Sequence, residues 1–287
     1  MTHAEPLAQP RTEEQFRKDT AAVLDHPDFG LIHDRYTTSL SFYREASRPF
    51  AKLIANEDRY RALNFLFTIW AEKVGHGLDG SMTYGELHEI CRRGEISPRI
   101  LKTTLSLATL YGFLERRPNP ADGRSWLYIP TPAMIAFPQQ WLMPAANALD
   151  ALFPGQDRSG RLAQDSGALV HFLRSAGREF AAGTQPQTMQ ADFQEFYGRK
   201  EGGASFTMGL LVADAQGQPP LSRSEMASRY GLTKSQVTQL IAMGEQKGLM
   251  LVRNGVPMPT DLLRKNHAEW VALSLAFLGH HLLPNRG

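Results

Sequence analysis

Apolar residues recur at helical spacing along most of the chain. Within residues 59–75, for example, Leu63, Leu66 and Trp70 share one face, which predicts an amphipathic helix. Pro49 is expected to bend or break another predicted helix, residues 32–55. The same spacing predicts further helices, and therefore a mainly α protein, over residues 13–25, 84–93, 98–111, 160–182, 187–200, 204–215, 222–231, 234–248 and 267–283.

Short polar residues mark the starts of several of these helices. Their side-chain oxygens can accept hydrogen bonds from the first unpaired backbone N–H groups of a helix. Glycines, such as Gly94 and Gly248, mark helix ends. The residues expected to cap helices are Thr83 with Glu86, Ser97 before Pro98, Ser222 with Glu225, and Thr233.

A β-hairpin is predicted directly behind the helix of residues 98–111. Gly112 ends that helix, and the sequence continues as a short strand (LERR), a turn (PNPADG) and a return strand (SWLYI). Arg116 and Arg117 stand at the base of this hairpin and Arg124 at its tip. A positively charged hairpin behind a helix is typical of a wing that lies against a phosphate backbone.

The second half of the chain repeats this plan. An offset of 136 residues places Gly112 on Gly248 and Ser97 on Thr233 without a gap. The pattern indicates an internal duplication, with residues 154–157 as the linker between the copies. We therefore expect a disordered segment over residues 1–12, a first domain over 13–153 and a second over 154–287.

The second copy has the spacing of a helix-turn-helix motif. A small residue, a turn glycine and two apolar positions occur in order at Ala227, Gly231, Val237 and Leu240. The outer face of the second helix would then present short polar and amide side chains, which suit base edges and phosphate oxygens. The alternative is a solvated face of an unrelated helical hairpin. The candidate DNA-binding residues here are Thr233, Lys234, Ser235, Gln236, Thr238 and Gln239.

The first copy carries the larger set of basic residues. Its recognition helix would present Ser97, Arg99, Lys102, Thr103 and Ser106, and the hairpin adds Arg116, Arg117 and Arg124. Phosphate contacts are expected from the Arg and Lys side chains of both copies, and base contacts from Thr103, Ser106, Gln236 and Gln239. The alternative is a solvated, charged hairpin.

Composition narrows the function classes. The formal net charge is only +2, so any nucleic-acid surface must be local. The chain has no apolar run of membrane-spanning length and no signal-peptide pattern, and we expect a cytoplasmic protein of a prokaryote-like cell. Cys91 is the only cysteine, which excludes an internal disulfide and a cysteine-rich zinc site. We expect Cys91 to be a small buried residue, with a redox switch as the alternative.

Other candidates favour packing over chemistry. His280 and His281 adjoin an apolar run, and no carboxylate or cysteine lies at metal-ligand spacing in the sequence. Trp70, Trp141 and Trp270 are expected to fill the core, with the lining of a ligand pocket as the alternative. No phosphate loop, nucleophile elbow or metalloprotease motif occurs. We therefore expect no enzyme, no cofactor and no metal.

Residues 112–133, GFLERRPNPADGRSWLYIPTPA, resemble the wing of MarR-type regulators. Asp122 and Arg124 match the turn of that wing and Thr131 matches its end. The resemblance covers about residues 60–135. It implies a winged-helix fold, transcriptional control that a small-molecule effector can relieve, and minor-groove or phosphate binding by Arg124 with Asp122 bracing it.

The chain departs from that family in length and symmetry. MarR-type proteins are about half as long and act as homodimers, whereas this chain carries both half-site readers. The second copy also lacks a full wing, because residues 253–255 form a tight turn and residues 256–260 (VPMPT) are not expected to continue as a paired strand.

The sequence thus predicts a mainly α chain with small β-hairpin wings. It would hold two tandem winged helix-turn-helix domains, related by pseudo-twofold symmetry, with additional flanking helices. Its expected function is sequence-specific binding of double-stranded DNA in transcriptional regulation, as a monomeric pseudo-dimer or a homodimer, at an asymmetric site or an imperfect palindrome. The alternatives are a replication initiator or partition protein, and a winged-helix scaffold that binds protein.

Overall fold

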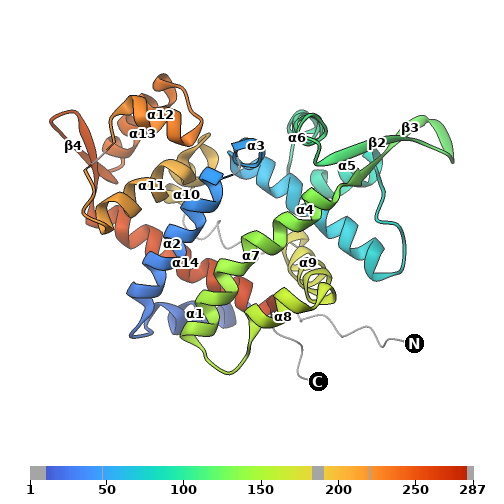
Figure 1. Cartoon of the computed structure of the whole chain (residues 1–287), viewed down its shortest axis with the longest axis horizontal. Coiled ribbons are helices and arrows are strands. Elements are labelled where there is room, and N and C mark those ends of the chain that lie inside the picture. Colours follow the sequence, from blue (N-terminus) through green and yellow to red (C-terminus); the bar gives the residue numbers. More distant parts are fainter. Residues whose placement is uncertain (1–10, 47, 183–190, 220, 283–287) are drawn as a thin grey trace. The chain divides into compact units, whose positions relative to one another are not determined.

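The structure is a computed structural model that describes residues 11–46, 48–182, 191–219 and 221–282. It is mainly helical, with two small antiparallel sheets among the described residues (Figure 1). The chain divides into two compact units, and neither is continuous in sequence. Unit 1 comprises residues 1–16, 58–185 and 277–287, and unit 2 comprises residues 17–57 and 186–276.

This division differs from the two contiguous domains expected from the duplication. The expected linker, residues 154–157, lies inside unit 1. Residues 17–57 belong to unit 2 although the expected first domain includes them, and residues 277–282 belong to unit 1 although the expected second domain includes them. The duplication is a local signal, whereas a compact unit is defined by contacts between segments far apart in the sequence, so the two divisions need not coincide.

Unit 1 is a helical body with one three-stranded sheet. Helix α1 (Glu13–Leu24) and helix α14 (Asp261–Leu282) each contribute residues to both units. The other elements of unit 1 are α4 (Glu57–Gly75), β1 (Met82–Thr83), α5 (Tyr84–Arg93), α6 (Pro98–Leu110), β2 (Leu114–Asn119), β3 (Asp122–Pro130), α7 (Pro132–Leu152), α8 (Arg158–Gln164) and α9 (Ser166–Ala181).

Residues 11 and 12 lead directly into helix α1. Residues 1–10 of the segment expected to be disordered lie outside the described residues. Thr12 caps α1, because its hydroxyl accepts a hydrogen bond from Gln15 N at 3.2 Å while Gln15 Oε1 accepts one from Thr12 N at 2.9 Å. Thr12, inside the segment expected to be disordered, thus takes part in the start of α1.

Two helical segments of unit 1 differ from the sequence prediction. Residues 160–182, expected as one helix, form α8 and α9, because Asp165 caps α9 through Gly167 N. Helix α7 was not predicted, since Pro138 and Pro144 lie in its interior, where proline removes a backbone hydrogen bond. Its many buried side chains, such as Phe137 and Leu142, explain how the helix persists.

The sheet of unit 1 has the strand order β1-β3-β2 and is antiparallel throughout. Strand β1, which is too short to predict from sequence, pairs Met82 with Tyr128 and Thr83 with Leu127. Strands β2 and β3 form the first hairpin (Leu114–Pro130), which projects beyond α5 and α6 (Figure 1). The strands are longer than predicted, and only residues 120 and 121 connect them.

Unit 2 is also helical, with a two-stranded sheet. Helix α2 packs against α11. Residue 47 separates α2 from α3 and lies outside the described residues, as does part of the helix predicted over 187–200. The elements of unit 2 are α2 (Phe29–Ala46), α3 (Arg48–Leu53), α10 (Ala191–Gln194), the π-helix η2 (Glu195–Arg199), α11 (Gly203–Ala215), α12 (Arg223–Tyr230), α13 (Lys234–Gln246), β4 (Met250–Arg253), β5 (Val256–Pro259) and most of α14.

The second hairpin (Met250–Pro259) corrects the prediction for residues 256–260. Pro257 and Pro259 do lie in a paired strand, opposite Val252 and Met250. In a hairpin with a two-residue turn, the backbone nitrogens at positions 257 and 259 point away from the partner strand. Proline has no N–H group, but at these two positions none is needed for the pairing. Positive φ angles at Asn254 (51°) and Gly255 (79°) form that turn.

The two units share a local arrangement where each hairpin begins and ends. Gly112 (φ 72°) and Gly248 (φ 67°) take the left-handed conformation that leads from a helix into a strand. Thr131 Oγ1 donates to Gly112 O at 3.0 Å, and Thr260 Oγ1 donates to Gly248 O at 2.8 Å. Each threonine also caps the helix that follows its hairpin. The two hairpins thus begin and end with matching contacts.

Candidate nucleic-acid interface

Helix α6 presents the predicted polar residues on its exposed face. Ser97 caps the helix by accepting a hydrogen bond from Ile100 N at 3.3 Å. Residues Leu101, Leu105 and Ala108 are buried and fix the orientation of the helix. The opposite face carries exposed side chains at every predicted position: Arg99, Lys102, Thr103 and Ser106.

These exposed side chains differ in the contacts they already make. Thr103 Oγ1 donates to Arg99 O at 2.9 Å, so its hydroxyl can offer a ligand only lone pairs while that bond persists. Lys102 Nζ lies 6.0 Å from the centre of the Tyr84 ring. Arg99 makes no ion pair with another described residue. The guanidinium of Arg99 is therefore available to an anion.

The turn between α5 and α6 is set by packing as well as by backbone freedom. Helix α5 ends at Gly94, as predicted, but Gly94 has φ −84° and Glu95 takes the left-handed conformation at 58°. A Cβ atom on Gly94 would lie 2.4 Å from Cε2 of Phe65. Glycine is needed there because α4 approaches the turn closely.

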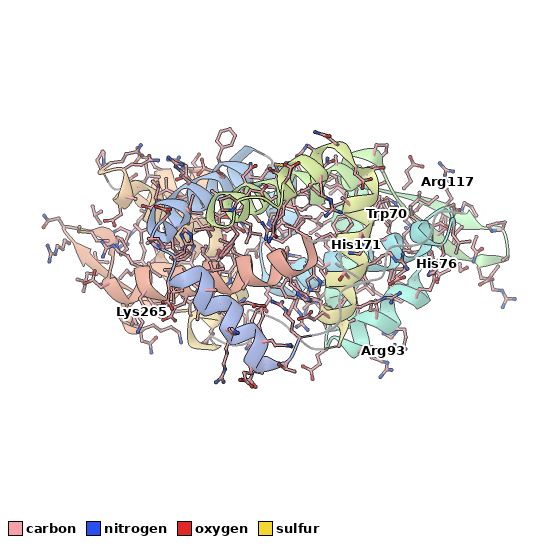
Figure 2. All side chains as sticks on the ribbon, turned by 90° about the horizontal axis from the view of Figure 1, so that it is seen from below. Trp70, His76, Arg93, Arg117, His171 and Lys265 are labelled. Carbon is pink, nitrogen blue, oxygen red and sulfur yellow. The ribbon has the colours of Figure 1, made fainter. Side chains whose placement is uncertain are left out.

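The first hairpin places Arg116 and Arg117 on opposite faces, because successive strand residues alternate. Arg116 lies opposite Tyr128, with its guanidinium 4.5 Å from the centre of the Trp126 ring and 5.8 Å from that of Tyr128. Arg117 lies on the other face and pairs with Glu115 at 2.7 Å. Figure 2 shows Arg117 at the surface. A ligand that lies against one face of the hairpin therefore contacts the side chain of only one of these two arginines on that face.

The tip of the first hairpin presents Arg124 in an irregular stretch of β3. The register shifts so that Asn119 faces Asp122 while Pro118 faces Trp126, which leaves residues 123–125 without pairing partners. Asp122 Oδ1 accepts a hydrogen bond from Arg124 N at 3.1 Å. Asp122 thus holds the backbone of Arg124, and the side chain of Arg124 is exposed and makes no ion pair with the described residues.

Helices α12 and α13 of unit 2 have the environments that the helix-turn-helix spacing predicts. Ala227, Val237 and Leu240 are buried between the elements, and Gly231 takes the left-handed conformation at φ 67°. The exposed side chains on the outer face are Thr233, Lys234, Ser235, Thr238 and Gln239.

Gln236 differs from its predicted role as a base reader. Its Oε1 accepts a hydrogen bond from Thr233 N at 2.8 Å, while Thr233 Oγ1 accepts one from Gln236 N at 3.1 Å. This reciprocal pair is a capping box and stabilises the start of α13. Gln236 is half-buried, so a role in base contact would require it to leave the cap.

The two candidate surfaces carry unequal charge. On α13 Lys234 is the exposed cation, and Thr238 Oγ1 donates to Lys234 O at 2.9 Å. Arg229 of α12 pairs with Glu45 at 2.9 Å, which neutralises it locally. Arg253 of the second hairpin is also exposed and makes no ion pair with the described residues. The unpaired cations are therefore Lys234 and Arg253 on the unit 2 surface, and Arg99, Lys102 and Arg124 on the unit 1 surface, which has the larger unpaired charge.

Three further sequence candidates have definite surroundings. Cys91 is fully buried, and burial raises the pKa of its thiol to about 11, as expected of a structural residue. Trp70 is buried in unit 1, Trp141 of the same unit lies against Tyr60, and Trp270 of unit 2 lies against Tyr197. These contacts are those of packing residues, and the three tryptophans do not belong to one unit.

The histidines at the end of α14 have a carboxylate neighbour that sequence spacing did not reveal. Glu179 of α9 lies 3.1 Å from His281, measured from Oε2 to Nε2. The two residues are far apart in the chain, so only the fold brings them together.

None of the described helices combines the length and apolar character that a membrane crossing requires. Comparisons with protein-family models, with curated proteins and with solved structures gave no match.

Proposed function

We propose that this chain is a sequence-specific double-stranded DNA-binding regulator of transcription, with α6 and the first hairpin as its principal reader. In this proposal each unit contains a winged helix-turn-helix, and the chain acts as a pseudo-twofold counterpart of a MarR-type dimer. The second reader comprises α13 and the second hairpin. A small-molecule effector, expected from the MarR resemblance, belongs to the same proposal.

The observation that carries the proposal is the exposed face of α6. It begins at a capped N-terminus and presents Arg99 and Lys102, followed by the short hydroxyl side chains of Thr103 and Ser106. Cations bind phosphates, and short polar groups suit base edges in the major groove. The first hairpin adds Arg124 at an exposed tip, and its likeness to a MarR-type wing supports a backbone or minor-groove contact there.

The local geometry reduces the set of phosphate ligands expected. Arg117 is paired with Glu115 and Arg116 is stacked on Trp126, so neither is as available as Arg99. Arg99, Lys102, Arg124 and Lys234 remain as the principal phosphate ligands. Neutralising about four phosphates predicts a slope of roughly −4 for log affinity against log salt concentration.

The first test is selection of bound sequences from a random duplex pool with the full chain, followed by affinity measurements at several salt concentrations. We expect a defined site. Doubly substituted R99Q/K102Q should lower affinity and make the salt slope less negative by about one for each phosphate that is no longer neutralised. The matched control is R92Q/R93Q, which removes the same charge from side chains that pair with Glu89 on α5.

The competing function is a scaffold that binds protein through the same helices. A flat salt response with no selected sequence, or equal loss of affinity in the two double variants, would contradict specific DNA binding and favour the scaffold. Selection of repeated sites would instead favour a replication or partition protein.

A further inference from the structure

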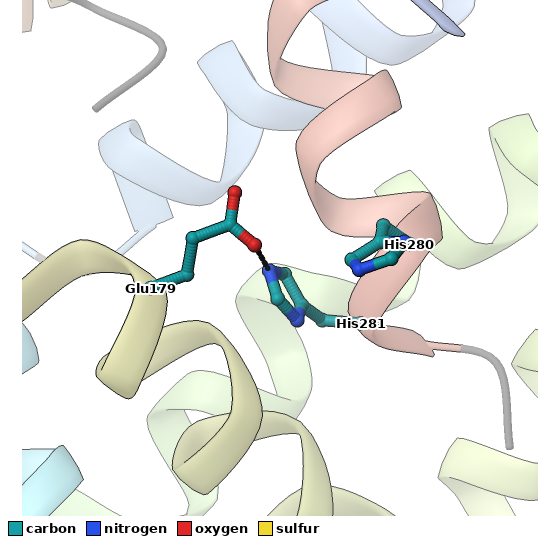
Figure 3. Close-up of side chains that lie close together, drawn as sticks. All are labelled: Glu179, His280 and His281. Carbon is teal, nitrogen blue, oxygen red and sulfur yellow. Dashed lines mark ion pairs between the residues drawn. The ribbon is translucent and has the colours of Figure 1, made fainter. Parts of the chain in front are cut away.

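Unit 1 contains a cluster of metal-ligating side chains apart from the candidate nucleic-acid surface. Glu179 comes from α9, and His280 and His281 from the last turn of α14 (Figure 3). Their candidate ligand atoms all lie within 4.8 Å of one another. Glu179 and His281 are each 1% exposed, whereas His280 is half-buried.

The contact between Glu179 and His281 needs a proton or a metal ion between the two atoms. Glu179 Oε2 and His281 Nε2 are 3.1 Å apart, yet neither has a hydrogen-bond partner of good geometry among the described residues. A carboxylate oxygen and an imidazole nitrogen both present lone pairs, so a proton or a metal ion must lie between them. Two donors about 2.0–2.1 Å from one tetrahedral ion would be about 3.3 Å apart, close to the observed separation.

The other ring nitrogen of His281 is already held. Ser175 Oγ lies 2.8 Å from His281 Nδ1, and Ser175 is itself buried. With a metal on Nε2, Nδ1 carries the proton and donates it to Ser175 Oγ. A hydrogen bond donated by the second ring nitrogen is the usual support for a metal-binding histidine, because it fixes the ring and directs the remaining nitrogen at the ion.

Arg11 bounds the site on its other side. Its Nη2 atom lies 3.6 Å from Glu179 Oε1, which leaves Oε2 for an ion. A proton shared between Glu179 and His281, with Arg11 as counter-charge, is the competing arrangement.

We propose that Glu179, His280 and His281 bind one zinc ion that joins the end of α9 to the last turn of α14. Two imidazole nitrogens and one carboxylate oxygen are donors that suit zinc or a similar borderline divalent metal. Three protein ligands leave a fourth position for water. Because two of the ligands are almost fully buried, the ion stabilises unit 1 and does not depend on DNA binding.

The test is titration of the full-length, chelator-treated chain, purified without a polyhistidine tag, with Zn²⁺ by calorimetry and with Co²⁺ by visible absorption. We expect one ion per chain and the absorption of a four-coordinate cobalt site. H280Q should weaken binding by about tenfold or more, and S175A by about tenfold. H76Q is the matched control, since His76 is 64% exposed and lies elsewhere in unit 1.

H280Q replaces a half-buried residue, so metal-free H280Q is expected to unfold at the same temperature as the metal-free parent chain. E179Q, which removes the carboxylate charge, provides a second variant for the same titration. Absence of one-to-one binding by the parent chain would overturn the proposal in favour of the shared proton. Equal affinity of H280Q and the parent chain would also overturn it.

Discussion

At the scale of single residues, several side chains have environments that their sequence neighbours could not predict. Glu179 is an example, because its partners His281 and Arg11 lie far from it in the chain. Gln236 fits the outer face of a predicted recognition helix, but a local capping box engages it. The helix-turn-helix spacing predicts correctly which positions are buried and does not specify which exposed side chains are already hydrogen-bonded.

His267 is the residue whose titration should most affect stability. It is fully buried in unit 2, and its Nδ1 lies 2.9 Å from Nε2 of His33. Burial first, and the charge of His33 second, hold the pKa of His267 well below its usual value of 6.5. Below about pH 6.5, His267 binds a proton in the unfolded chain but not in the folded chain. The contribution of His267 to the free energy of unfolding is therefore complete above that pH and falls as the pH is lowered.

We expect the free energy of unfolding to decrease by up to about 1.4 kcal/mol per pH unit from this residue alone, between pH 6.5 and 5. Urea unfolding at closely spaced pH values measures the decrease. H267Q should show a flatter dependence, and H76Q should keep the parent slope. Parallel curves for H267Q and the parent chain would show that His267 does not cause the acid sensitivity.

At the scale of elements, the sequence predicted best where the determining contacts are local. Helix α5 begins and ends where its capping residues predicted, because a cap involves neighbouring residues only. Helix α7 was missed because Pro138 and Pro144 argue against a helix unless its burial is known. Strand β1 was missed because two residues carry no periodicity, and only pairing with β3 defines it.

Thr131 and Thr260 offer a test of the duplication at this scale. Each hydroxyl donates to the carbonyl of the glycine before its hairpin and accepts from the first turn of the next helix. T131A and T260A should each lower the free energy of unfolding by about 1 kcal/mol, as for other helix caps that are removed. Chemical denaturation of both variants measures this.

T109A is the control for those two variants, because the Thr109 hydroxyl donates to Leu105 O within its own helix and does not cap a helix. T109A should lower the free energy of unfolding clearly less than T131A or T260A does. If T131A and T260A differ strongly from each other, with T260A near the control, the two threonines are not equivalent and the structural match between the repeats is incidental.

At the scale of the whole molecule, the discontinuous units change how the two-reader hypothesis can be tested. A cut at residue 153 would separate α8, α9 and the end of α14 from the rest of unit 1. Such a cut would also break buried packing within unit 1, such as that of Leu149 against Gly279. Neither fragment would be a complete unit, so weak binding by a fragment would say little about the readers.

Point substitutions on one surface of the intact chain avoid this difficulty. If both units read half-sites, K234Q/Q239A on α13 should lower affinity for the selected site. Both side chains are exposed, so the substitutions leave the core of unit 2 unchanged. R99Q/K102Q on α6 should lower affinity more, since the unit 1 surface carries more unpaired charge. If K234Q/Q239A binds the selected site as tightly as the parent chain at every salt concentration, unit 2 does not read DNA and the chain has one reader. Substitution of base pairs in each half of the site shows which unit reads which half. In each variant, only the half that the altered surface reads should lose its sequence preference.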